Sequence, residues 1–186
     1  MNKITHLLIG VVFLIATTTV SAGEKAPQKV IDLANTGLAL LGTDTVIVRA
    51  VRAQNAERKT PAQIQGRDRQ WIAAPGVTDF MRGLMTSVCG RHLRRFQRST
   101  PYFAEIFVMD NQGALVAITN KTTDYWQGDE AKFIRAYNNG AGAVYVSEVA
   151  FDESTRTDLV HISVPVVDNR KTIGVVTLGV AVDKVE

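Results

Sequence analysis

Carboxylates and aromatic residues gather in two short stretches of the second half of the chain. Residues 124–130 and 145–152 together supply the candidate ligand-binding residues, which are Asp124, Tyr125, Trp126, Asp129, Glu130, Tyr145, Glu148 and Asp152. Aromatic walls combined with carboxylates suit a cation that has been taken out of water. The two stretches therefore predict a small-molecule pocket, formed where the fold brings them together across a sheet.

The same residues also admit a purely structural interpretation. Asp124 can cap a turn, and Asp129 and Glu130 can stabilise the start of a following helix. Tyr125 and Trp126 can close the hydrophobic core. In that case the protein is a structural or inhibitory partner protein whose cavity is filled by its own side chains.

Residue types that mark catalytic or metal sites are scarce. The three histidines, His6, His92 and His161, have neither the HExxH spacing nor an adjacent nucleophile motif. We interpret His161 as a half-exposed strand residue and the single cysteine, Cys89, as a small buried apolar residue. No catalytic residue, metal or cofactor is predicted. A periplasmic hydrolase that uses carboxylates such as Asp124 and Asp129 as acid and base remains the less favoured alternative.

Residues 23–100 show mainly helical periodicity. Apolar residues at spacings of three and four predict one long amphipathic helix over residues 27–58. A capping threonine, a proline in the first turn and Gln63 predict a short helix from Thr60 to about residue 72. A third apolar stripe predicts a helix over residues 78–97.

At Pro101 the pattern changes from helical to strand-like. Residues 104–109 and 114–119 predict a hairpin, residues 130–138 a short helix, and residues 143–150, 159–167 and 172–182 three further strands. We therefore expect an α+β fold, in which a long N-terminal helix and two further helices pack on a five-stranded antiparallel sheet. Residues 23–100 form the helical region and residues 101–186 the sheet of a single domain.

The first 22 residues have the features of a secretory signal peptide. Lys3 precedes an apolar run over residues 7–16, and Val20, Ser21 and Ala22 provide the small residues of a cleavage site. We expect cleavage after Ala22 and a periplasmic location. The alternative is an uncleaved anchor in the inner membrane.

Composition and charge narrow the possible partners. The chain has 186 residues, of which 46% are hydrophobic and 21% charged, as expected for a globular domain. Residues 23–100 carry 13 Lys or Arg against 6 Asp or Glu, whereas residues 101–186 carry 7 against 12. The small net charge of +3 does not favour nucleic-acid binding.

The second half resembles the PDC or Cache family, the extracytoplasmic PAS-like sensor domains of bacterial chemoreceptors and sensor kinases. The resemblance rests on the hairpin EIFVMDNQGALVAIT, the segment TTDYWQGDE, the turn YVSEVAFDES and the closing pair ISVPVVDNRKTIGVVTLGV. It implies a non-enzymatic sensing module. Transmembrane receptors of the family continue into a second membrane helix and an output domain, whereas this sequence ends at Glu186, so we expect a stand-alone exported module that acts through a separate membrane signalling protein. The helix over residues 27–58 is the expected interaction or homodimer element.

The resemblance also bears on the charge of the ligand. Amino-acid-binding members of the family place an Arg and a Trp shortly after the Asp-Tyr pair, where this chain has Gly128, Asp129 and Glu130. A carboxylate ligand would be repelled there. The resemblance therefore implies a cationic or neutral polar ligand, such as an amine.

Overall fold

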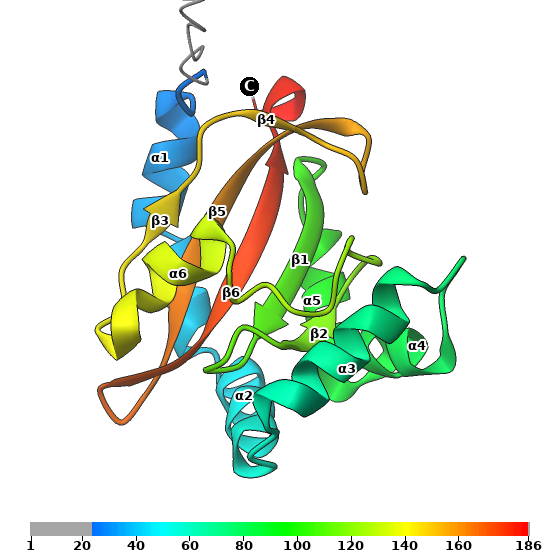
Figure 1. Cartoon of the computed structure of the whole chain (residues 1–186). Coiled ribbons are helices and arrows are strands. Elements are labelled where there is room, and N and C mark those ends of the chain that lie inside the picture. The colour runs from blue at the N-terminus through cyan, green and yellow to red at the C-terminus, as the bar shows by residue number, and fades with distance from the viewer. Residues whose placement is uncertain (1–23, 186) are drawn as a thin grey trace, which may run out of the picture.

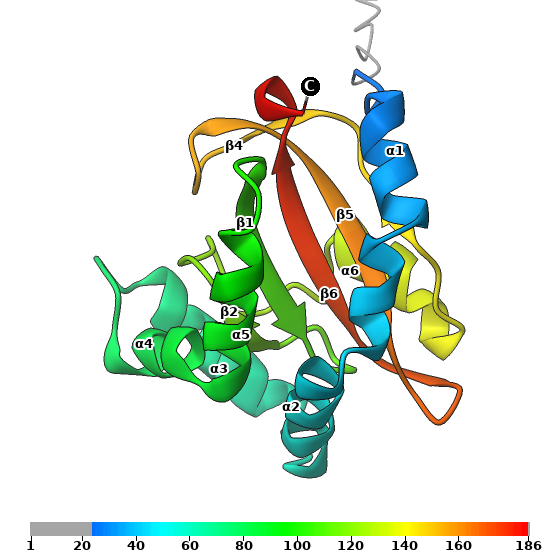
Figure 2. The same cartoon turned by 180° about the vertical axis from the view of Figure 1, so that it is seen from behind.

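The computed structural model describes residues 24–185, which form one sheet with helices on both faces (Figures 1 and 2). The predicted signal peptide and its cleavage site lie outside the described residues. The helices are α1 (Gln28–Asn35), η1 (Leu38–Thr43), α2 (Thr45–Ala56), α3 (Pro61–Ile72), α4 (Asp79–Thr86), α5 (Val88–Gln97), α6 (Ala131–Tyr137), η2 (Asn138–Gly140) and η3 (Val182–Lys184). The predicted α+β class is confirmed.

The sheet is antiparallel and has the strand order β2-β1-β6-β5-β3, with β4 also paired to β5. Its strands are β1 (Phe103–Met109), β2 (Leu115–Ile118), β3 (Tyr145–Val146), β4 (Ala150–Asp152), β5 (Thr157–Asp168) and β6 (Lys171–Ala181). The predicted strand over residues 143–150 is thus two short strands. Between them the Ser147 hydroxyl, rather than a backbone carbonyl, accepts a hydrogen bond from the His161 N–H at 2.9 Å.

The prediction of one long helix over residues 27–58 is wrong. The segment forms α1, η1 and α2, and the axis bends by 58° at Asp44. Asp44 has an extended conformation, and its carboxylate accepts hydrogen bonds from the N–H groups of Val46 and Ile47 at 2.8 and 3.2 Å, which starts a new helix. Within the described residues, no single helix is long and apolar enough to span a membrane.

The predicted helix over residues 78–97 is also divided, whereas the helix after Thr60 is confirmed. Ser87 is extended and caps α5 through a hydrogen bond from the Gly90 N–H at 2.9 Å, so α4 ends before it. Thr60 and Gln63 form the predicted capping box at the start of α3.

The two faces of the sheet carry separate hydrophobic clusters. The back face, in front in Figure 2, is covered by α1, η1, α2 and α5, which pack on residues such as Ile106, Val108 and Ile162. The front face, toward the viewer in Figure 1, carries Phe107 and Met109 and is covered by α3, α4, α6 and the segment between β2 and α6. Cys89 is buried in the back cluster, as predicted.

Candidate functional site

A pocket of about 760 Å³ opens on the front face of the sheet, between α6 and the segment that carries β3 and β4. Its lining includes Glu130 at the N-cap of α6, Lys132 and Arg135 within α6, and His161 of β5. Tyr145, Glu148 and Asp152 line it from the opposite side. The described residues enclose another hollow of about 740 Å³ between α1 and the chain end, but none of the predicted site residues lines it.

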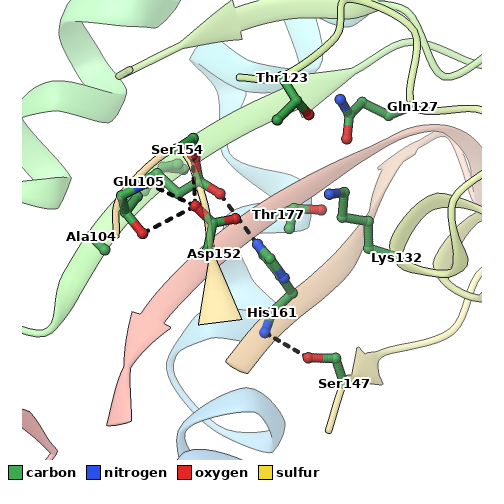
Figure 3. Close-up of polar contacts among 12 residues, drawn as sticks. Ala104, Glu105, Thr123, Gln127, Lys132, Ser147, Asp152, Ser154, His161 and Thr177 are labelled. Carbon is green, nitrogen blue, oxygen red and sulfur yellow. Dashed lines mark hydrogen bonds and ion pairs between the residues drawn. The ribbon is translucent and has the colours of Figure 1, made fainter. Parts of the chain in front are cut away.

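A row of three residues across the central strands lies at the inner end of the pocket, which His161 lines. In the strand register, Gly179 of β6 pairs with both Glu105 of β1 and His161 of β5. Since Gly179 has no side chain, the Glu105 and His161 side chains meet above it, with His161 Nε2 at 3.2 Å from Glu105 Oε1 (Figure 3). Glu105 is only 3% exposed, which is unusual for a carboxylate.

The next row along the same face is also polar. Ser163 of β5 pairs with Thr177 of β6, and their hydroxyl oxygens are 2.8 Å apart. Both residues are completely buried. Together with Glu105 and His161, they place buried hydrogen-bonding groups on the front face of the central strands, and the two hydroxyls satisfy each other.

Asp152 is fixed at the end of β4 by the turn that follows it. Asp152 Oδ1 accepts hydrogen bonds from Ser154 Oγ at 2.7 Å and from the Thr155 N–H at 2.8 Å. Burial raises the pKa of this carboxyl, but the hydrogen bonds from Ser154 and Thr155 outweigh burial, and the net pKa is lowered. Asp152 is therefore a charged, preoriented group at the pocket.

Two basic side chains from α6 add positive charge to the lining of the pocket. Lys132 Nζ lies 2.9 Å from Glu130 Oε2 and 5.5 Å from the centre of the Phe107 ring. The Arg135 guanidinium lies 5.6 Å from the centre of the Tyr145 ring. The pocket thus contains both signs of charge, and its acids outnumber its bases because Glu130, Glu148, Asp152 and Glu153 all line it.

The structure brings together four of the eight predicted site residues, namely Glu130, Tyr145, Glu148 and Asp152. Tyr125 lies elsewhere: it is buried in the front cluster, with its ring 5.9 Å from that of Trp71. Trp126 is held by its Nε1, which donates to the Gln112 carbonyl at 2.8 Å. These two aromatic residues therefore have the structural role of the alternative interpretation, in which they close the hydrophobic core.

Asp124 and Asp129 do not line the pocket. Asp124 accepts a hydrogen bond from the Gln127 amide and lies beside Glu130 and Lys132. Burial, followed by repulsion from Glu130, raises the pKa of Asp124 to about 6. Asp129 is exposed just before α6.

Sequence reasoning missed four polar residues of this site. The sequence patterns do not single out Glu105, Lys132 or Arg135, and they predict His161 only as a half-exposed strand residue. The available signal is Glu105 itself, because at a spacing of two it lies on the same strand face as Phe107 and Met109, which is an inward-facing position in an apolar strand. A charge at such a position indicates a partner or a ligand.

Helices on both faces of one antiparallel sheet, with a polar pocket on the front face, define a small α+β domain. Residues 90–186 match the family described as "Methyl-accepting chemotaxis protein-like, first PDC sensor domain". The match covers more than half of the chain, and the protein belongs to this family. The predicted family is confirmed; it is a family of extracytoplasmic sensor domains and not of enzymes.

Several solved sensor domains are similar in structure, with low sequence identity. The sensory domain of the Campylobacter jejuni chemoreceptor Tlp3 with isoleucine bound is 13% identical, with a TM-score of 0.42 over 85% of this chain and 63% of that chain. The V. cholerae histidine kinase DctB sensor domain is 10% identical, with a TM-score of 0.39 over 86% and 59%. The E. coli DcuS sensor domain is 18% identical, with a TM-score of 0.41 over 67% and 90%.

The chain spans about 60% of the length of the first two of these domains. A comparison with curated proteins gives no match.

Proposed function

We propose that this protein is a non-enzymatic sensing domain that binds a small polar molecule with a positively charged group in the front-face pocket. The observation that carries the proposal is the cluster of carboxylates at one end of the pocket, where the buried Glu105 lies beside Asp152 and Glu148 lines the wall. An uncompensated buried carboxylate is costly, so a ligand cation adds favourable interactions at this end.

The positions of the basic residues support a cationic rather than an anionic ligand. Lys132 already pairs with Glu130, and Arg135 lies over Tyr145. Glu148 and Asp152 line the opposite side of the pocket, which the aromatic residues Tyr145 and Phe151 also line. Carboxylates beside aromatic rings favour an ammonium group.

The geometry gives less support to the alternatives. A self-filled cavity is expected to leave no free volume beneath the segment before α6, whereas Thr123 and Glu130 of that segment line a pocket. A hydrolase based on Asp124 and Asp129 needs both carboxylates at one substrate, but Asp124 is bonded to Gln127 and Asp129 is exposed. We therefore favour binding without turnover.

The proposal is tested by a thermal-shift screen of amines, amino acids and organic acids on the full chain. A ligand at about 100 times its dissociation constant adds roughly 2.7 kcal/mol to the stability of the native state. We expect amines to raise the melting temperature, and Asp152→Asn and Glu148→Gln to abolish the shift. Asp158→Asn is the control, because Asp158 of β5 pairs with Phe151 of β4 but does not line the pocket. Stabilisation by organic acids alone, unchanged in the variants, refutes the proposed charge of the ligand.

We further propose that the protein is exported to the periplasm and signals through a separate membrane protein or a second copy of itself, which contacts the segment over residues 27–58. The course of β5 supports this proposal, because His161 of the strand lines the pocket and Pro165 of the same strand lies against Gly42 of η1. Leu40 of η1 is 71% exposed and is the side chain we expect a partner to cover.

Light scattering coupled to size-exclusion chromatography tests the contact with a second copy. We expect a dimer that Leu40→Glu converts to a monomer, while Ile134→Glu, at an exposed apolar residue of α6, has no effect. A monomer at all concentrations excludes the second copy and leaves the membrane protein as the proposed partner.

A further inference from the structure

We propose that Glu105, Asp152 and His161 form a binding site for a divalent transition-metal ion at the inner end of the front-face pocket. One ligand atom from each residue lies within 4.8 Å of the other two. From sequence we expected no metal, because His92 and His161 lie in different elements and have no HExxH spacing. The site shares Glu105 and Asp152 with the proposed binding of a cationic ligand, so a metal ion and that ligand are alternative occupants, and metal binding is tested without an amine.

The strand register is the first support for this site. Glu105 and His161 flank Gly179, and a Cβ atom at Gly179 would lie 2.8 Å from Glu105 Cγ. Only a glycine at this position of β6 lets the two side chains meet above the central strand. His161 Nε2 and Glu105 Oε1, 3.2 Å apart, already have the separation expected of two ligands on one ion.

The burial of Glu105 is an independent observation. Its side chain is 4% exposed, and its contacts among the described residues are His161 Nε2 at 3.2 Å and Ser154 Oγ at 3.5 Å. The second contact is at the limit of a hydrogen bond. A carboxylate this deeply buried normally has a strong charged partner or a metal.

Asp152 and His161 are held in place by neighbouring groups. The turn after β4 directs hydrogen bonds from Ser154 and Thr155 to Asp152 Oδ1. Ser147 fixes the backbone of His161 through its hydroxyl. Figure 3 shows Glu105 and Asp152 side by side with the His161 ring directed toward them. Ligands oriented in this way by surrounding hydrogen bonds are typical of metal sites.

The ligand set indicates which ion binds. An imidazole with two carboxylates suits Zn²⁺ or a neighbouring transition metal better than Mg²⁺ or Ca²⁺, which prefer oxygen ligands alone. Tetrahedral Zn²⁺ with bonds of 2.0–2.2 Å places its ligands about 3.4 Å apart. The three residues therefore contract slightly on binding and leave a fourth position open toward the pocket.

Isothermal titration of the metal-free full chain with Zn²⁺, in a preparation without a histidine tag, tests the site. We expect one ion per chain. Loss of second-shell hydrogen bonds lowers metal affinity 10- to 100-fold, so His161→Gln, which removes a ligand, is expected to lower it by more than about 100-fold. The matched control is His92→Gln, because His92 contacts one carboxylate, Asp44, at 2.9 Å and has no second acid in a comparable cluster among the described residues.

A second variant separates loss of the site from loss of the fold. Glu105→Gln keeps the shape of the side chain and removes its buried charge, so the metal-free variant is expected to melt no lower than wild type while Zn²⁺ binding is lost. Absence of Zn²⁺ binding by the wild type, or equal binding by wild type, His161→Gln and Glu105→Gln, overturns the proposal. Equally tight binding of Mg²⁺ or Ca²⁺ overturns the assignment to a transition metal.

Discussion

Gly179 provides a direct test of the geometry at the inner end of the pocket. A Cβ atom there meets Glu105 Cγ at 2.8 Å and Leu159 Cδ1 at 2.9 Å. Carbon atoms in contact prefer about 3.5–4.0 Å, so both side chains must move by roughly 1 Å. Because these are side-chain and not backbone atoms, the strand pairing survives. We expect Gly179→Ala to lower the free energy of unfolding by about 1–3 kcal/mol, the usual range for overpacking a core.

Two other glycines calibrate this prediction. At Gly174 of β6 a Cβ atom would lie 2.3 Å from the backbone oxygen of Met109, which moves less easily, and Gly174→Ala should be more destabilising than Gly179→Ala. At Gly83 of α4 a Cβ atom meets no described atom within 4 Å. Gly83→Ala should raise the free energy of unfolding by about 0.5–1 kcal/mol, because glycine is a poor helix former.

Urea unfolding, followed by far-ultraviolet circular dichroism and by tryptophan fluorescence, measures all three variants. The expected order of stability is Gly83→Ala, wild type, Gly179→Ala and then Gly174→Ala. If Gly179→Ala is as stable as wild type, or less stable than Gly174→Ala, the proposed crowding of Glu105 above β6 is refuted.

Four further predictions concern single side chains. Asp44→Ala should lower the free energy of unfolding by about 1 kcal/mol through loss of the α2 cap, as measured by urea unfolding. Asp44→Asn should retain most of the stability that the cap contributes, because asparagine is also a good N-cap residue. Burial and then Glu130 raise the pKa of Asp124 to about 6, so wild type should lose stability as the pH rises from about 4 to 6. The Asp124→Asn variant should lack this part of the pH profile. Burial and then Asp44 raise the pKa of the Cys89 thiol to about 12, so a thiol reagent should label the protein only after unfolding. Tyr125→Ala should lower the free energy of unfolding by about 3–5 kcal/mol, the range for a buried aromatic residue, while Tyr125→Phe should leave ligand binding unchanged in calorimetry.

Local patterns predicted much of the fold because they depend on neighbouring residues alone. The capping box at Thr60, the hairpin after Pro101 and the final two strands follow from short-range chemistry. The prediction of one long helix over residues 27–58 is wrong because the apolar stripe continues across the break between two helices at Asp44. Asp44 is a strong N-cap residue inside that stripe, and its preference for starting a helix outweighs the periodicity.

The site was only partly predictable for a different reason. Glu130, Tyr145, Glu148 and Asp152 lie in two polar stretches that stand out in the sequence. Glu105 and His161 are single polar residues within apolar strands, and they meet only because both pair with Gly179. Strand register is set by the whole sheet, so no local pattern indicates that these two residues are neighbours.

The alternation along β5 separates two roles within one strand. His161 lines the pocket and Ser163 lies on the same face of the strand, whereas Val160, Ile162 and Val164 pack on the back-face helices. Side chains on the pocket side can therefore be substituted without changing the apolar residues that pack against the back-face helices. A domain built in this way can acquire a new ligand through a few substitutions on one side of one strand, which makes it a suitable scaffold for engineered biosensors.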